Sequence, residues 1–193
     1  MTFIKPVEEG EASGRVAELF TEEKGRRGYV PNYLSLFALR PQVYEAWVGL
    51  IGSIMANMDR RRFELATLAA AKALSSSYCS LAHGLVLRKK FLSDPELEQV
   101  VQGEALEAVD QAVMELARKV VADAARITDT DIEQLRKLGL SDDEIFDVVL
   151  AAAARSFFAK ALDATGTVPD REYRELLGPV LSDRLTVGRP IEA

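Results

Sequence analysis

Residues 60–84 read RRRFELATLAAAKALSSSYCSLAHG, and this stretch decides the fold class. Its first part, residues 60–74, consists mainly of strong helix formers and carries a single acid, Glu64, in an alanine-rich apolar body. Such a helix is apolar around most of its circumference and packs in the centre of a bundle. A serine-rich break then leads into a second helical stretch that contains Cys79 and His83. The stretch therefore predicts two consecutive helices in an all-α protein.

Cys79 and His83 are the only cysteine and the only histidine in the chain, and they lie four residues apart. They therefore share one face of the predicted helix. A thiol reacts as its thiolate, which a neighbouring imidazole and a helix N-terminus both favour. We expect Cys79 to be a reactive thiol in the first turn of its helix. His83 would accept its proton directly or through a water, and Glu64 would orient the imidazole.

Two simpler interpretations stay open. Cys79 can be a small buried hydrophobe beside an ordinary histidine. Glu64 can be a buried acid that pairs with an arginine, for example Arg155. Either arrangement would leave these residues without a chemical role.

Helical patterns continue along the chain with almost no alternation of period two, which half-buried strands would show. The length of 193 residues favours one domain, residues 1–193. Serine, threonine or aspartate at expected helix starts and glycine at expected ends support this interpretation. These signals are Asp94 before Pro95, the capping boxes 130–133 and 141–144, and the stops Gly139 and Gly166. The predicted helices are 13–24, 32–39, 42–57, 60–74, 77–92, 95–102, 104–126, 130–138, 142–165 and 170–177.

Composition excludes several classes of function. A net charge of −6 argues against nucleic-acid and anionic-membrane partners, which demand clustered basic surface. The chain opens without a signal-peptide pattern and contains no apolar stretch of the roughly 18 residues that span a bilayer. One cysteine excludes an intramolecular disulfide, so we expect a reducing cytoplasm. One histidine and one cysteine cannot complete a zinc site and no glycine-rich phosphate loop is present, so we expect neither metal nor cofactor.

The order of Glu64, Cys79 and His83 resembles the active-site stretch of the AhpD-like family. This family includes peroxidase-related proteins and carboxymuconolactone decarboxylases. Its redox branch has a Glu, eleven residues, Cys-x-x-Cys, three residues and a His. In this chain, Ser76 occupies the position of the first cysteine, and Tyr78 and Cys79 follow it. The resemblance implies an AhpD-like helical bundle with a Glu–His proton relay.

Flanking segments resemble the peroxidase-related subgroup as well. They extend the similarity to about residues 28–170, although Ala159 stands where that subgroup often has asparagine. Relatives assemble as dimers, trimers or hexamers, so the resemblance implies a homo-oligomer. The small-residue face of Gly49, Gly52 and Ser53 is expected to be a close helix crossing. The matching segments are 28–33, 36–41, 141–145 and 162–166.

Ser76 is the departure that matters for function. In the two-cysteine pattern, peroxide oxidises one thiolate and the second thiol resolves the sulfenic acid to a disulfide. Serine cannot do so, and turnover would need an external thiol reductant. Ser76 is instead expected to support the site by hydrogen-bonding the Cys79 thiolate, and Tyr78 flanks the thiol.

Three function classes remain. The first is a thiol-dependent peroxidase or reductase of the alkylhydroperoxidase type, acting on peroxide or another small molecule through Cys79. The second is a cofactor-free carboxymuconolactone decarboxylase-like lyase, in which His83 and Glu64 transfer protons on an organic acid. The third is a degenerate, non-catalytic oligomeric scaffold. A positively charged anchor beside His83 would favour the second class, and a buried, unreactive Cys79 the third.

Overall fold

The computed structural model describes residues 2–104 and 107–193, and these residues form α-helices, two short 3-10 turns and no strand. The all-α prediction is therefore confirmed. Part of the helix predicted at 104–126, residues 105 and 106, lies outside the described residues. The helices are α1 (Gly14–Arg27), α2 (Asn32–Phe37), α3 (Pro41–Asn57), α4 (Arg60–Ala73), α5 (Ser77–Lys90), α6 (Asp94–Gln102), α7 (Ala108–Asp123), α8 (Asp129–Lys137), α9 (Asp142–Ala164) and α10 (Tyr173–Leu185).

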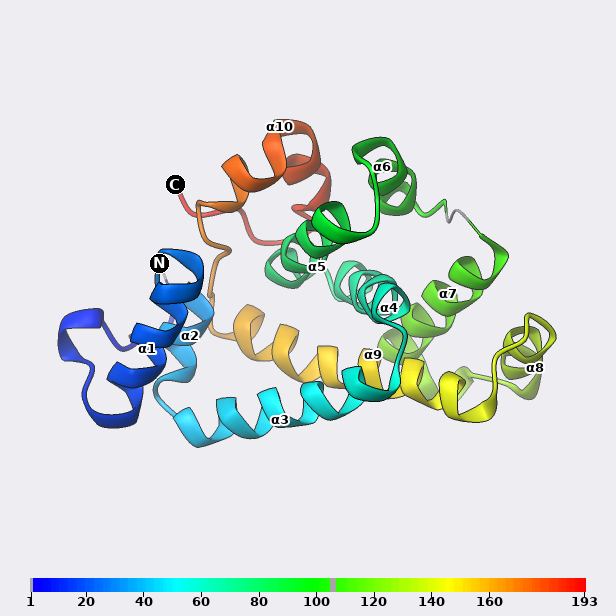
Figure 1. Cartoon of the computed structure of the whole chain (residues 1–193), viewed down its shortest axis with the longest axis horizontal. Coiled ribbons are helices and arrows are strands. Elements are labelled where there is room, and N and C mark those ends of the chain that lie inside the picture. Colours follow the sequence, from blue (N-terminus) through cyan, green and yellow to red (C-terminus); the bar gives the residue numbers. More distant parts are fainter. Residues whose placement is uncertain (1, 105–106) are drawn as a thin grey trace.

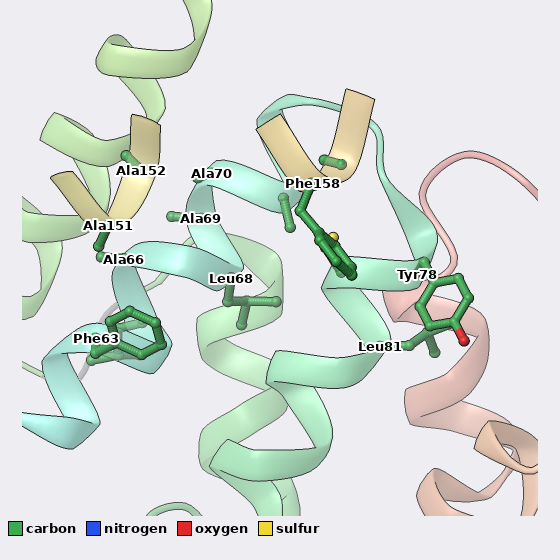
Figure 2. Close-up of a cluster of buried hydrophobic side chains, with 14 of the residues drawn as sticks. Phe63, Ala66, Leu68, Ala69, Ala70, Tyr78, Leu81, Ala151, Ala152 and Phe158 are labelled. Carbon is green, nitrogen blue, oxygen red and sulfur yellow. The ribbon is translucent and has the colours of Figure 1, made fainter. Parts of the chain in front are cut away.

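Helix α4 occupies the centre of the bundle, as its apolar circumference predicts (Figure 1). It packs against α5, α7 and α9, and all its residues from Phe63 to Ala71 are buried. Alanines let the helix backbones approach closely where α4 meets α9. Figure 2 shows this contact, with Ala66, Ala69 and Ala70 of α4 near Ala151 and Ala152 of α9. Because α4 is fixed on several sides, the side chains it presents to α5 are held rigidly.

Several helix boundaries differ from prediction because the caps lie elsewhere. The capping box of α6 begins at Ser93 and that of α8 at Thr128, so both helices start earlier than predicted. The capping box at Ser141 and the stops at Gly139 and Gly166, both with positive φ, are confirmed. Helix α10 continues past its predicted end because it resumes after a non-helical Gly178 (φ 74°, ψ 167°).

The small-residue face of α3 does not form the expected crossing within the chain. A Cβ added at Gly49 or Gly52 would meet no atom within 4 Å, and both glycines and Ser53 are exposed. Apolar side chains on the same helix are also exposed, including Val43, Val48 and Leu50. The surface of α3 that carries these residues therefore stays uncovered in a single chain.

The C-terminal segment, residues 186–193, crosses the start of α5. The Gly188 N–H donates to Ser77 Oγ at 2.8 Å, and a Cβ on Gly188 would lie 1.9 Å from the Ser75 carbonyl oxygen. Ser75 itself has a positive φ of 54° in the tight turn between α4 and α5. The segment thus packs backbone against backbone at the turn that precedes Cys79.

Gly188→Ala should lower the free energy of unfolding by about 1–3 kcal/mol, because two backbone segments must separate to admit the methyl group. Urea unfolding monitored by circular dichroism measures the effect. Gly25→Ala is the matched control, since an added Cβ there meets nothing within 4 Å in α1. The free energy of unfolding of that variant should rise by up to about 1 kcal/mol, because alanine reduces the backbone entropy of the unfolded chain. Equal stability of Gly188→Ala and wild type would contradict the close contact.

Candidate functional site

Helices α4 and α5 bring Glu64, Cys79 and His83 together. Cys79 is the third residue of α5, in its first turn as predicted, and His83 follows one turn later. Glu64 Oε2 lies 2.6 Å from His83 Nδ1, and both side chains are buried. The predicted contact between carboxylate and imidazole is confirmed.

Glu64 has a second partner, Arg60, one turn earlier on α4. Arg60 Nε and Nη2 lie 2.8 Å and 2.7 Å from Glu64 Oε1. Burial raises the pKa of Glu64, but the contacts with His83 and Arg60 outweigh it and hold this pKa below its usual value. Glu64 is therefore ionised at neutral pH. Glu64 does pair with an arginine, as the simpler interpretation expected, but that arginine is Arg60 and not Arg155.

His83 is neutral at neutral pH. Burial and the positive charge of Arg155 lower its pKa, and these effects outweigh the opposing effect of Glu64. Since Glu64 is ionised and can only accept, the imidazole donates its Nδ1–H to the carboxylate. Its Nε2 is then unprotonated and able to accept a proton. Among the described residues no direct hydrogen bond joins His83 to Cys79, so a proton passing between them needs a bridging water.

Arg155 of α9 is the site residue that sequence reasoning placed wrongly. Its Nη1 lies 3.6 Å from Cys79 Sγ, and its guanidinium carbon lies 5.4 Å from the Trp47 ring centre and 5.7 Å from that of Phe158. The side chain is only 4% exposed. A lone cation in the apolar run of residues 150–159 was the signal available in the sequence.

These residues open onto one cavity of about 650 Å³, which is lined by side chains of α1, α2, α3, α4, α5, α9 and α10. Cys79, His83, Glu64 and Arg155 all line it, although Cys79 is only 1% exposed. The thiol is therefore reached from the cavity rather than from the outer surface. Figure 2 shows Phe158 reaching from α9 toward the start of α5. The aromatic lining comprises Tyr33, Tyr44, Trp47, Phe63, Tyr78, Phe158 and Tyr173.

Solved structures share this arrangement of helices. An AhpD-core, peroxidase-related protein from Ralstonia eutropha JMP134 superposes with a TM-score of 0.80, 21% identity and coverage of 92% of this chain and 97% of that chain. The chain has the AhpD-like fold. A peroxidase-related protein from Silicibacter sp. TM1040 matches with a TM-score of 0.75 and 22% identity, covering 85% and 87% of the two chains.

A third match is a complex of the debrominase Bmp8, as a cysteine-to-alanine variant, with 2,3,4-tribromopyrrole. Its TM-score is 0.74 at 14% identity, covering 92% of this chain and 96% of that chain. No family model and no curated protein matches the sequence. Likeness at this level of identity establishes the fold.

In the described part of the chain there is no cluster of metal-binding side chains and no helix that could span a membrane. Within residues 2–104 and 107–193, no group of three or more His, Cys, Asp or Glu side chains is arranged to hold a metal ion. None of the helices in these ranges has the length and apolar character that crossing a membrane requires.

Ser76 does not support the thiol in the way the sequence suggested. Its side chain is fully buried, and Ser76 Oγ has no hydrogen-bond partner among the described residues, Cys79 included. The hydroxyl lies near the Asp163 carboxylate without the geometry of a normal hydrogen bond. The expected bond from Ser76 to the thiolate is therefore wrong: the side chain at the start of α5 is turned toward α9.

Tyr78 anchors the start of α5. Its hydroxyl donates to Asp170 Oδ2 at 2.5 Å, and Asp170 Oδ1 accepts from the Asn32 N–H at 2.7 Å. In Figure 2 the Tyr78 hydroxyl points away from α4. Asp170 thereby joins the starts of α2 and α5, which both border the cavity. Burial raises the pKa of Asp170 to about 6, despite these two hydrogen bonds.

This pKa predicts a pH-dependent stability. The folded state holds the Asp170 proton more tightly than the unfolded chain, in which the carboxyl has its ordinary pKa of 3.8. Protonated Asp170 therefore contributes its full amount to the free energy of unfolding below about pH 4. This contribution is lost as the pH rises through about 6. At roughly 1.4 kcal/mol per unit, the loss by pH 7 is about 3 kcal/mol. In urea unfolding, the free energy of unfolding of Asp170→Asn should rise by about that much relative to wild type between pH 4 and pH 7.

Asp183→Asn, at an exposed position of α10, is the control for removing a carboxylate. Its stability relative to wild type should change little across the same range. A difference between Asp170→Asn and wild type that stays constant from pH 4 to pH 7 would contradict the raised pKa of Asp170.

Proposed function

We propose that the chain is an AhpD-like, thiol-dependent reductase that uses Cys79 on a small organic substrate, such as an organic hydroperoxide. One observation carries the proposal: a cysteine in the first turn of a helix shares a cavity with an ionised carboxylate–imidazole pair. The cavity of about 650 Å³ is far larger than hydrogen peroxide needs, which favours an organic molecule.

The residues have distinct roles in this reaction. His83 Nε2 takes the thiol proton through a water, and Glu64 stabilises the imidazolium that forms. The Cys79 thiolate attacks the terminal oxygen of the hydroperoxide: an S–O bond forms, the O–O bond breaks, and sulfur is oxidised to sulfenic acid. The alkoxide that leaves takes the proton from His83 and departs as an alcohol.

Recovery of the thiol needs two external thiols because the chain has no second cysteine. The first condenses with the sulfenic acid, forms a mixed disulfide and releases water. The second attacks the mixed disulfide, which frees the Cys79 thiol and the disulfide of the reductant. A reducing cytoplasm would supply such thiols.

The test measures peroxide consumption and free thiol together. Without added thiol, wild type should consume about one equivalent of cumene hydroperoxide per chain and stop, since sulfenic acid has no internal partner. Addition of dithiothreitol should restart consumption. Cys79→Ser should consume none at either stage. Identical behaviour of wild type and Cys79→Ser toward the hydroperoxide would overturn the proposal.

A lyase of the carboxymuconolactone decarboxylase type is the second candidate. Arg155 favours it, because a cation close enough to lower the pKa of His83 is the anchor that an organic acid would need. Proton transfer by His83 and Glu64 would then be the chemistry, and Cys79→Ser would retain activity. A thiol that is inert to alkylation in native protein, with no lyase activity, would instead indicate a scaffold.

We further propose that the chain self-associates through α3 and α9. These helices pack together and expose Val43, Val48 and Leu50 on α3, and Phe146 and Phe157 on α9. Scattered exposed apolar residues are ordinary, but an apolar face on two adjoining helices is typical of an interface. Light scattering at micromolar concentration should return at least twice the mass of one chain, and a monomer mass would contradict the proposal.

A further inference from the structure

Arg155 is a buried cation that the protein does not neutralise. It is 4% exposed, and none of the carboxylates in the described residues forms an ion pair with it. Its contacts are the thiol of Cys79 and the faces of Trp47 and Phe158. Removing a guanidinium from water without a counter-ion costs several kcal/mol, so such a group normally has an anionic partner.

A Cys79 thiolate would accept a hydrogen bond from only part of the Arg155 guanidinium. Arg155 Nη1 faces the sulfur, whereas the Nε–H of the same guanidinium is buried with no acceptor. Trp47 Nε1, on the opposing helix α3, is a second buried N–H with no acceptor among the described residues. Both side chains line the cavity. The chain supplies no acceptor to either donor, and a ligand that brings acceptor oxygens into the cavity would supply one.

The side chains around these donors form a surface that suits a planar ligand. Trp47 and Phe158 stack on each other with ring centres 4.1 Å apart and 24° between their planes. The other aromatic side chains of the lining add further apolar surface, and the volume of about 650 Å³ exceeds that of a single ring. A planar apolar molecule therefore has room and surface to bind beside the guanidinium.

We propose that this cavity binds an aromatic or similarly planar organic anion, whose carboxylate or equivalent oxyanion accepts hydrogen bonds from Arg155 and Trp47. Arg155 then fixes the charged end of the substrate beside Cys79 and His83. A fork of N–H groups facing two oxygens is the geometry in which arginine recognises carboxylates. This inference rests on the proposed function, because it names the substrate class of the same site. Its test, however, measures binding alone.

The experiment uses the Cys79→Ser chain, so that no thiol chemistry interferes. Acetate, benzoate and 2-naphthoate are titrated at pH 7 beside their neutral amides. Trp47 is the only tryptophan in the chain, so its fluorescence reports on the cavity, and calorimetry confirms the affinities. At least one aromatic carboxylate should bind about tenfold or more tightly than its amide, the preference expected of a charged hydrogen bond. Acetate should bind more weakly than the aromatic acids.

Arg155→Met in the same background should reduce the ratio of carboxylate to amide affinity to about one, because the charge is lost while the apolar stem remains. Arg118→Met is the matched control: Arg118 pairs with Glu115 on α7 and does not line the cavity, so the ratio should be unchanged. If circular dichroism shows Arg155→Met to be unfolded, Arg155→Gln takes its place, with the same expected ratio.

Three outcomes overturn the inference: no binding of any of the three acids at millimolar concentration, equal affinity for acid and amide, or an unchanged ratio without Arg155. The proposed function fails on a different measurement, the hydroperoxide consumption of wild type against Cys79→Ser. If the chain binds anions selectively but its thiol is inert, this inference is supported and the proposed reductase function is rejected. An active thiol with no anion preference would do the reverse.

Discussion

His83→Asn should slow the reaction of Cys79 with hydroperoxide by about 10²–10⁴-fold, the usual contribution of a positioned general base. His83 is held neutral by burial and Arg155, with its Nδ1–H on Glu64, so its Nε2 is free to accept a proton. Asparagine can still donate to Glu64 but cannot accept the thiol proton. Stopped-flow measurement of hydroperoxide consumption, together with alkylation of Cys79 by iodoacetamide, determines the loss.

Two further measurements make this prediction specific. Ser80→Ala, on the same helix, is the matched control, because Ser80 Oγ is buried without a partner among the described residues and its removal should leave the rate unchanged. The pKa of His83 is lowered, so the imidazole should remain a base below pH 6.5, and the wild-type rate should start to fall only at lower pH. An equal rate for His83→Asn and wild type would remove His83 from the mechanism.

The contact between Glu64 and His83 could be predicted because local rules determine it. Residues at helical spacing on α5 share a face, and an acid inside an apolar helix must find a buried partner. The partners that the sequence analysis named for Glu64 were His83 and an arginine, and the structure shows contacts with both kinds of residue. Arg60 lies one turn before Glu64 on the same helix, so the same local rule favours it as the arginine partner, whereas the arginine named from the sequence, Arg155, is far away along the chain.

The environment of Arg155 and Ser76 could not be predicted in the same way. Which side chains face Arg155 depends on how α9 is rotated against α3 and α5, and an alanine-rich helix that is apolar on all sides does not fix this rotation. Ser76 is the residue before α5, where backbone geometry rather than helical periodicity sets the direction of the side chain. The cavity itself arises from α1 and α3 covering the other helices, a long-range arrangement without a sequence pattern.

Ser76→Cys should give the chain an internal reductant and change its stoichiometry. With one equivalent of hydroperoxide and no added thiol, the variant should lose both thiols, whereas wild type should lose its one thiol as a sulfenic acid. The new thiol condenses with the sulfenic acid of Cys79, an S–S bond forms and water leaves. Positions 76 and 79 stand three residues apart at the start of α5, a spacing compatible with the roughly 3.5–4.5 Å between Cβ atoms that a disulfide needs.

The structure adds a condition, because the Ser76 side chain is turned toward Asp163. The new thiol must rotate away from Asp163 to reach Cys79. Ser77→Cys is the matched control: Ser77 Oγ accepts from the Gly188 N–H, and its position is two residues from Cys79. That variant should keep one free thiol after one equivalent of hydroperoxide. Mass spectrometry under non-reducing conditions, with a free-thiol count, separates the two results, and one remaining thiol in Ser76→Cys would show that the start of α5 cannot bring the two sulfurs together.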